Sequence, residues 1–299
     1  MKKYTTLLLP FFLLAFIKFL SAQNKTVVFQ SDFGLKDGAV SAMKGVAMGV
    51  SPDLKLFDLT HEIPAYNIWE AAYRLEQTVP YWPAGTVFVS VVDPGVGTNR
   101  RSVVLKTNSG HFIVTPDNGT LTLLAESLGI AEMREIDEAV NRRKNSERSY
   151  TFHGRDVYAY TAARLAAGSI TFEQVGPVLP KQVVNIPYQQ AAMTGNRIKG
   201  TIAILDVQYG NIWTNIPAEL FNKLNVKVGD KLQVLIYRNN IKRYEGIMPY
   251  SETFGGVPKG KPLLYLNSLL QVSFALNMGS FSEVHKVYSG SEWRVEIRK

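Results

Sequence analysis

A carboxylate and a guanidinium lie seven residues apart in the segment VDPGVGTNRR, residues 92–101. They belong to Asp93 and Arg100, and because a very apolar run precedes them, the segment is predicted to be a turn after a strand. A carboxylate can accept a proton, whereas arginine keeps its charge and only donates hydrogen bonds. The pair therefore indicates a site that handles a proton, unless the two residues pair only to hold the glycine-containing turn.

Polar residues also end other predicted strands. Asp32 ends the run KTVVFQSD, His61 follows LKLFDLT, and Asp117 and Asn118 follow a fourth apolar run. A single aspartate at a strand end is usually a turn or cap residue. Ligands of open α/β sheets, however, bind beyond the carboxyl ends of the strands. Together with Asp93, four predicted strands end on polar residues, and this repetition favours one shared cleft. His153, in TFHGRD ahead of a predicted helix, is a further candidate for this cleft. The position of His61 is equally consistent with a structural capping residue and with a functional-site residue.

The composition disfavours several kinds of site. The chain has 299 residues and no cysteine, which removes thiol nucleophiles, disulfides and cysteine-based zinc sites together. No paired-histidine spacing is present, so no metal site is predicted, and the glycines of DPGVG match neither a dinucleotide-binding motif nor a P-loop. The net charge is +8, but its two densest basic patches, residues 142–144 and 238–243, are interpreted as solvated loops, and no nucleic-acid partner is expected.

The first 22 residues have the composition of a secretory signal. Two lysines precede an apolar run that ends on small residues, and cleavage is predicted near Ala22. The apolar run is short for a membrane span. The mature protein is therefore expected to be exported, to the periplasm or out of the cell; an uncleaved signal that anchors the protein to a membrane is the alternative.

The order of the predicted elements favours an α/β fold. Short apolar runs alternate with segments of helical spacing, which indicates a sheet with helices packed on its faces. We expect an N-terminal α/β catalytic domain over residues 25–187. Its expected elements are strands at 25–32, 54–60 and 85–93, helices at 37–50, 67–79 and 154–168, and a hairpin at 101–117.

The pattern changes near residue 180. A linker with two prolines precedes a mostly β region in which only 218–225 has helical spacing, so a smaller β-rich domain is expected over 190–299. Its segment DVQYGNIWTNI combines an acid, aromatic rings and asparagines. Rings stack on a flat heterocycle and amides pair with its edge, so this segment is a candidate ligand pocket. A β-turn with Tyr209 and Trp213 in the core is the alternative.

Seven motifs carry a resemblance to a known family: SDFGLKDGAVSAMKG, DLTHEIPAYNI, GTVFVSVVDPGVGTNRR, FIVTPDNGTL, TFHGRDVYAYTAA, DVQYGNIWTNI and LNSLLQVSFALNMGSF. In this order, from about Val27 to Phe281, they resemble the S-adenosyl-L-methionine (SAM) hydrolases, also called SAM hydroxide adenosyltransferases, which are related to the fluorinase and chlorinase enzymes. The resemblance implies an N-terminal α/β domain, a C-terminal β-barrel-like domain, and a homotrimer with its active site at a subunit interface. No cofactor is expected, because the candidate residues can handle water themselves and no metal-ligand spacing is present. The implied activity is hydrolysis of SAM to adenosine and L-methionine by in-line attack of water at the ribose 5′ carbon.

The resemblance also implies roles for individual residues. Asp93, Arg100 and His153 match a catalytic trio that handles water, and the acid at Asp93 favours water over halide because the halogenases have neutral residues there. The remaining implied contacts are Asp32 with the ribose diol, Asp37 and Asp206 near the methionine ammonium, Tyr66 on the sugar and sulfonium, Tyr209, Asn211 and Trp213 around adenine with Asn277 as a further amide, and Ser268 at the methionine carboxylate.

The chain departs from the family pattern in two ways, and these leave other functions possible. The halogenases have an arginine after the serine, where this chain has Leu269, so a hydrolase of another 5′-substituted adenosine is one alternative. SAM is made in the cytosol, so a secreted protein that binds adenosine or nucleosides without turnover is another. The intact Asp93, Arg100 and His153 set favours the enzyme, because a pure binding protein has no need of all three.

Overall fold

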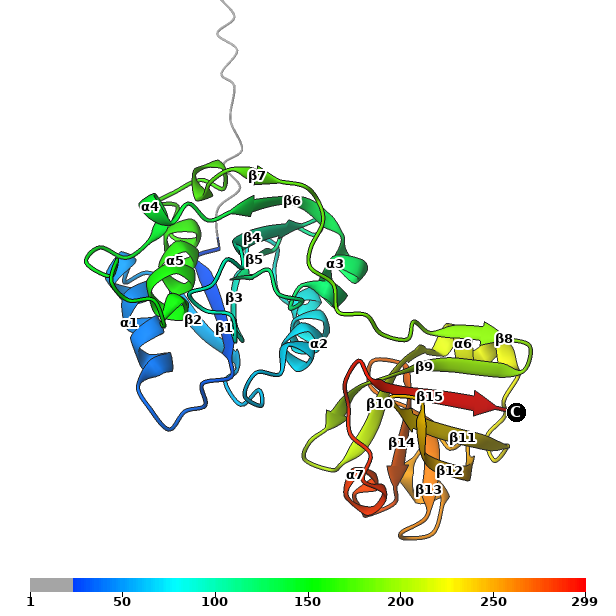
Figure 1. Ribbon diagram of the computed structural model, residues 1–299. Coiled ribbons are helices and arrows are strands. Elements are labelled where there is room, and N and C mark those ends of the chain that lie inside the picture. Colours follow the sequence, from blue (N-terminus) through cyan, green and yellow to red (C-terminus); the bar gives the residue numbers. More distant parts are fainter. Residues whose placement is uncertain (1–23) are drawn as a thin grey trace, which may run out of the picture.

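The computed structural model describes residues 24–299, which form two sheet domains (Figure 1). The predicted signal, residues 1–22 with its cleavage near Ala22, lies outside the described residues. Within residues 24–299 no helix has the length and apolarity needed to cross a bilayer. The fold class expected from the sequence, an α/β domain followed by a smaller barrel-like β domain, is confirmed.

The N-terminal sheet has seven strands in the order β2-β1-β3-β5-β4-β6-β7. Strands β2, β1, β3 and β5 are parallel, and β4, β6 and β7 join antiparallel. The strands are β1 (Thr26–Ser31), β2 (Lys55–Thr60), β3 (Val87–Val91), β4 (Ser102–Thr107), β5 (Phe112–Pro116), β6 (Ile130–Glu135) and β7 (Val178–Leu179). The helices are α1 (Ala39–Val50), α2 (Ile68–Thr78), α3 (Thr122–Leu128), α4 (Glu138–Asn141) and α5 (Tyr160–Ala166), with short turns η1 (Val79–Tyr81), η2 (Gly154–Ala159) and η3 (Glu173–Val175).

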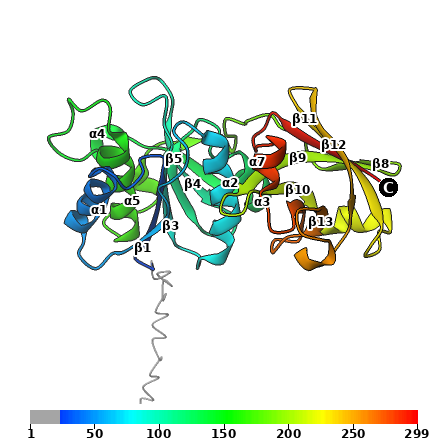
Figure 2. The same cartoon turned by 90° about the horizontal axis from the view of Figure 1, so that it is seen from below.

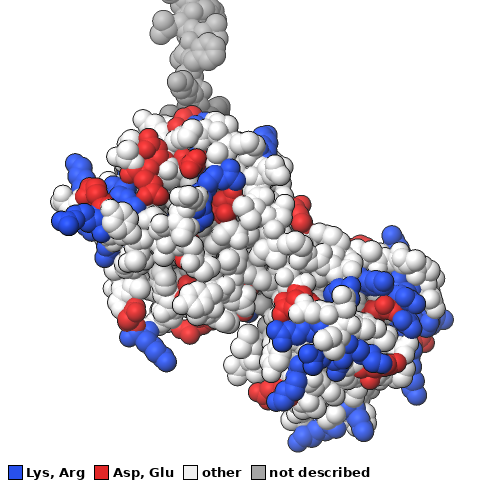
Figure 3. Space-filling model, viewed as in Figure 1, with Lys and Arg blue, Asp and Glu red and all other residues white. Residues whose placement is uncertain are grey.

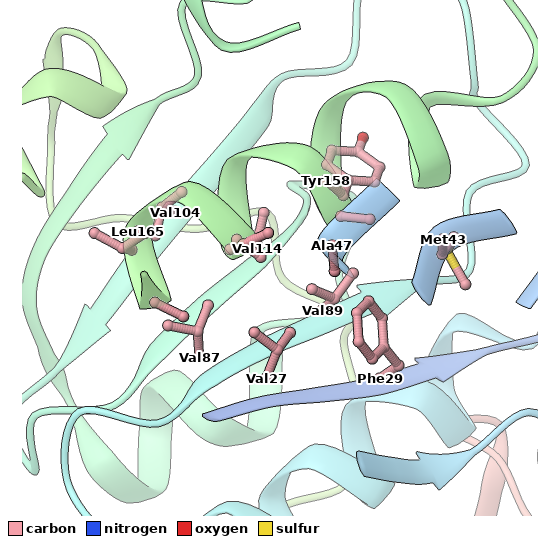
Figure 4. Close-up of a cluster of buried hydrophobic side chains, with 14 of the residues drawn as sticks. Val27, Phe29, Met43, Ala47, Val87, Val89, Val104, Val114, Tyr158 and Leu165 are labelled. Carbon is pink, nitrogen blue, oxygen red and sulfur yellow. The ribbon is translucent and has the colours of Figure 1, made fainter. Parts of the chain in front are cut away.

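Helices cover both faces of this sheet because its strands are apolar on both sides. Side chains alternate along a strand, so Val27 and Phe29 of β1 pack with α1 and α5, whereas Val28 packs with Leu75 of α2 and Leu124 of α3. Figure 4 shows the first of these layers, with residues of β1 and β3 beneath α1 and α5. The helix expected at 154–168 begins with the π-helical turn η2 and ends before Gly168, which has a φ of 73°.

The C-terminal sheet is antiparallel and nearly closes into a barrel. Its main path is β12-β11-β15-β9-β10-β14-β13, and a bridge between Tyr250 and Leu264 links the strands at the two ends. The elements are β8 (Ala192–Thr194), β9 (Arg197–Asp206), β10 (Asn211–Pro217), α6 (Ala218–Phe221), η4 (Asn222–Leu224), β11 (Lys231–Arg238), β12 (Ile241–Pro249), η5 (Phe254–Gly256), β13 (Pro262–Leu266), β14 (Gln271–Leu276), α7 (Phe281–His285) and β15 (Trp293–Arg298).

The two domains touch through α2 and the barrel strand β9. Residues 180–191, which contain no helix or strand, connect the two sheets. The indole Nε1 of Trp69 donates a hydrogen bond of 2.8 Å to the carbonyl of Ala203, and Tyr73 packs against Ala203 and Ile204. Figure 2 shows α2 at the side of the N-terminal domain that meets the barrel. Lysine and arginine are prominent on the face of the barrel seen in Figure 3. Residues 238–243 are exposed to solvent, as the sequence predicted, but they form the tip of the β11–β12 hairpin rather than a loop, with Asn239 and Asn240 as the turn.

Candidate active site

The first candidate site lies at the carboxyl ends of the central parallel strands. Strand β1 pairs with β2 on one side and β3 on the other, so the chain reverses its winding direction between β1 and β3. Such a switch point leaves a crevice between the loops that follow the two strands. Asp32 follows β1 and Asp93 follows β3, and both line a cavity of about 240 Å³. The other lining residues are Phe33, Ala65, Tyr66, Val91, Val96, Thr151, Phe152, His153 and Gly154.

Asp93 and Arg100 form a buried, two-point ion pair. The Nε of Arg100 lies 3.0 Å from Oδ1 and 3.1 Å from Oδ2 of Asp93, and its Nη2 lies 2.7 Å from Oδ2. The two side chains are only 10% and 6% exposed. Burial is the largest single influence and would lower the pKa of Arg100, but the hydrogen bonds to Asp93 and the neighbouring charges, those of Asp93 and Glu138 among them, together raise the pKa. Arg100 therefore stays charged and holds the carboxylate in one orientation.

The turn between these two residues requires glycine at one position. Gly97 has a φ of 77°, a conformation in which side chains are strained. A Cβ there would also lie 2.9 Å from the carbonyl oxygen of Tyr150. Gly97 thus lets the turn that carries Asp93 and Arg100 pack against the loop that leads to His153.

His153 lies between two arginines. Its Nδ1 is 2.8 Å from Nη2 of Arg100, and its Nε2 is 3.0 Å from Nη2 of Arg142. Burial lowers the pKa of His153, and the two arginine charges lower it further, whereas Glu138 and Asp93 act in the opposite direction. His153 is therefore neutral near pH 7. A neutral imidazole has one acceptor nitrogen and a guanidinium only donates, so only one of the two contacts is a hydrogen bond.

Asp32 and Tyr66 form the outer part of this cavity. The Oδ2 atom of Asp32 accepts a 2.9 Å hydrogen bond from the backbone N–H of Tyr66, and the tyrosine side chain is 73% exposed. The aspartate therefore fixes the loop that presents the ring at the rim. This geometry places Asp32, Tyr66, Asp93 and His153 around one cavity. Of the four polar strand ends that the sequence predicted to share a cleft, those at Asp32 and Asp93 meet here, whereas His61 and the pair Asp117 and Asn118 do not line the cavity.

A second, larger cavity of about 670 Å³ lies at one end of the barrel. The β9–β10 turn supplies Asp206, Tyr209 and Asn211, and the segment after β14 supplies Asn277. The Nδ2 of Asn211 donates a 3.2 Å hydrogen bond to Asp206, while the ring of Tyr209 is 65% exposed. The cavity is completed by Val207, Gln208, Gly210, Phe254, Leu276, Met278, Gly279, Ser280 and Glu283.

Three predicted binding residues line neither cavity. Asp37 is exposed at the start of α1, where its carboxylate accepts a 2.8 Å hydrogen bond from the N–H of Ala39. Trp213 packs at the contact between the domains, near Tyr73. Ser268 is exposed in the turn between β13 and β14. Their predicted contacts with a ligand remain predictions.

Several polar residues around the trio escaped the sequence analysis. Tyr158 donates to Asp93, and Ser102 accepts a 3.2 Å hydrogen bond from Arg100. Glu138 pairs with Arg142 at 2.5 Å. The interpretation of residues 142–144 as a solvated loop was wrong for Arg142, which contacts His153, and for Arg143, which pairs with a buried aspartate in the same motif.

Two other sequence candidates, His61 and Asp117, prove to be structural. His61 is buried, and its ring contacts Ser31 at 2.7 Å and Asp58 at 3.0 Å, outside both cavities. Arg101 points away from Arg100, as expected for a neighbour in an extended segment, and pairs with the fully buried carboxylate of Asp117.

We expect the substitution Arg101→Ala to lower stability but not turnover. The side chain of Arg101 is 37% exposed, so the loss is about 1–2 kcal/mol, less than for a fully buried pair. Urea unfolding measures the loss, and kcat should stay within a few-fold of wild type. A large fall in kcat at Arg101 with little change at Arg100 would show that the assignment is shifted by one residue.

The chain is similar to proteins of known family along most of its length. A model of the SAM hydroxide adenosyltransferase N-terminal domain matches residues 27–176, and a model of the C-terminal domain matches residues 200–294. A Salinispora tropica protein named (R)-S-adenosyl-L-methionine hydrolase is 34% identical over 275 residues, which cover 92% of this chain and 98% of that protein. A Thermus thermophilus protein of the same name is 34% identical over 277 residues, covering 91% and 99%.

A more distant relative and a solved structure are also similar to the chain over most of its length. A fluorinase from Actinopolyspora mzabensis is 27% identical over 302 residues, covering 92% of this chain and 98% of the enzyme. The crystal structure of an uncharacterized conserved protein from Thermotoga maritima superposes with a TM-score of 0.82 at 35% identity, covering 91% of this chain and 100% of that one. Matches to both domain models, and full-length relatives above 30% identity, show that this chain belongs to the SAM hydroxide adenosyltransferase family.

Proposed function

We propose that the chain hydrolyses SAM to adenosine and L-methionine. The observation that carries this proposal is the cavity in which a buried carboxylate, Asp93, is fixed by Arg100 beside the neutral His153. The relatives named (R)-S-adenosyl-L-methionine hydrolase support the same reaction, and they are more similar to the chain than the fluorinase is. An acid at position 93 suits the activation of water.

The reaction needs a fixed water opposite a good leaving group. Water attacks the ribose 5′ carbon, a C–O bond forms, and the C–S bond breaks with its electron pair going to sulfur, so methionine leaves as a neutral thioether. The water gives up a proton, and Asp93 is the acceptor in this proposal. Arg100 stays charged and orients the carboxylate, and the neutral His153 contributes to the orientation of this group. Much of the rate enhancement then comes from positioning the reactants in line.

The direct test is to incubate the purified mature chain with SAM and to quantify adenosine and methionine. Equal amounts of both products support the proposal. S-adenosyl-L-homocysteine lacks the sulfonium and should not react, because its leaving group would be a thiolate. Binding of adenosine without any turnover of SAM would instead show a nucleoside-binding protein, and turnover of another 5′-substituted adenosine alone would show a different substrate.

We further propose that the chain forms a homotrimer in which two subunits build each site. The two cavities share no lining residue: one uses residues 32–154 and the other residues 206–283. Exposed apolar side chains lie at or beside both, namely Leu35 and Tyr66 at the first and Val207, Tyr209 and Met278 at the second. Such surfaces favour contact between copies of the chain. Asp32, Asp93 and His153 from one subunit would then meet Asp206, Tyr209, Asn211 and Asn277 from its neighbour.

A mixing experiment tests this shared site. Asp93→Asn disables the part of the site that the N-terminal domain supplies, and Asn211→Ala disables the part that the barrel supplies. Each variant alone should therefore be nearly inactive. After unfolding and refolding together in equal amounts, a cyclic trimer should recover about one quarter of wild-type activity, because one site in four receives two intact halves. Refolded wild-type protein is the control. An active monomer in light scattering, or no recovery in the mixture, would contradict the shared site.

We also propose export of the mature chain, on the composition of residues 1–22. Cell fractionation should place the protein outside the cytoplasm, and the mature N-terminus should follow Ala22. A protein that keeps residues 1–22 and sediments with membranes would instead support the anchor.

A further inference from the structure

Tyr158 brings the only polar atom of its buried side chain to the catalytic carboxylate. The residue is fully buried in the turn η2, and its ring packs in the apolar layer between the sheet and α1 and α5. Figure 4 shows the hydroxyl at the end of the ring that points away from the surrounding apolar side chains. That hydroxyl lies 3.2 Å from Oδ2 of Asp93 and 3.3 Å from Oγ of Ser102.

The direction of the hydrogen bond follows from the partners of Ser102. Its hydroxyl has one proton, which it donates to Glu138 at 3.2 Å, and it accepts from Nη1 of Arg100 at 3.2 Å. Ser102 therefore has no proton left for Tyr158. Burial, and next the charge of Asp93, raise the pKa of Tyr158, so the phenol keeps its proton. Because a carboxylate is a stronger acceptor than a hydroxyl, the tyrosine proton points to Asp93.

The two oxygens of Asp93 are consequently unequal. Oδ2 accepts from Nη2 of Arg100 and from Tyr158, and it shares the single Nε proton of Arg100 with Oδ1. In the part of the chain that the structure describes, Oδ1 accepts only from Nε of Arg100. A carboxylate oxygen can accept about two hydrogen bonds. Oδ1 thus keeps a free acceptor position in a residue that lines the cavity.

We propose that Tyr158 is a positioning residue: together with Arg100 it commits Oδ2 of Asp93 to the protein and so leaves Oδ1 as the oxygen that takes the proton of the attacking water. This inference rests on the proposed function and assigns the proton to one atom. Arg100 and Tyr158 of η2 contact the carboxylate of Asp93 directly. The other charged or titratable groups around it are His153, which contacts Arg100, Glu138 of α4, which contacts Ser102 of β4, and Arg142, directly after α4, which contacts His153.

The substitution Tyr158→Phe removes one oxygen and keeps the ring in the core. We expect kcat to fall about tenfold, the effect of losing one hydrogen bond to a charged group, with KM within about twofold. Tyr160→Phe is the matched control, since that ring lies two residues along the chain and packs against Arg164.

A second measurement keeps the inference testable without turnover. The Nε–H signal of Arg100, assigned by its loss in Arg100→Lys, should shift in Tyr158→Phe and stay in place in Tyr160→Phe. If the wild-type chain did not hydrolyse SAM, the proposed function would fail while this shift would still support the contact. An unmoved signal, or a Tyr158→Phe enzyme with unchanged kcat, would overturn the role of Tyr158. A lower melting temperature with an unmoved Nε–H signal would show a packing role only.

Discussion

Substitution of Asp93 by asparagine is expected to lower kcat by a factor of ~10²–10⁴, the usual range for a positioned group that transfers a proton. Asparagine keeps the shape of the side chain but has no charge and cannot take the proton of water. Substrate binding should persist, because the diol contact proposed for Asp32 and the barrel cavity lie outside this pair. Product formation gives kcat, and calorimetry with SAM gives the affinity.

The alternative is that Asp93 and Arg100 pair only to hold the turn. That alternative predicts a lower melting temperature for Asp93→Asn and recovery of activity when the assay is run cold. The catalytic account predicts a kinetic defect that persists at every temperature at which the variant is folded. Asp53→Asn is a suitable control, because Asp53 forms an exposed ion pair with Lys25 away from both cavities and should change neither quantity.

Arg100→Ala is expected to impair both turnover and stability. Its removal leaves the carboxylate of Asp93, only 6% exposed, without its guanidinium partner, and breaking a buried pair in this way costs about 3–5 kcal/mol. Turnover should fall by ~10²–10⁴ because the proton acceptor is no longer held in place.

Arg100→Lys separates charge from geometry. Lysine keeps the charge but cannot reproduce the two-point contact that Nε and Nη2 make with the carboxylate. We therefore expect most of the stability to return and most of the kinetic defect to remain. Full activity in Arg100→Lys would show that charge alone suffices, and an Arg100→Ala protein with unchanged urea unfolding would contradict the burial argument.

The sequence predicted the main elements because their periodicity is strong. Strand ends at Asp32 and Asp93 fall at one edge of the sheet, since β1 and β3 are parallel neighbours and their carboxyl ends meet. The hairpin at 101–117 was also confirmed as β4 and β5. Here a local pattern was enough, because each prediction depended on residues close together in the chain.

The contacts that surround the trio were missed for a physical reason. Tyr158 has the helical spacing of a core aromatic, and its role depends on one oxygen that reaches Asp93, 65 residues earlier. Arg142 stands in a basic run typical of a solvated loop, yet it folds back on His153. The placement of Trp213 between the domains depends on how the sheet and the barrel dock, which no local pattern encodes.

The central claim, that water held at Asp93 attacks the ribose 5′ carbon, is tested most directly by reaction in ¹⁸O-water. The account predicts equal amounts of adenosine and methionine, with one ¹⁸O atom in the 5′ hydroxyl of adenosine, none in methionine, and a rate that collapses in Asp93→Asn. Adenosine without ¹⁸O, or attack on the methionine side to give 5′-methylthioadenosine, would contradict it.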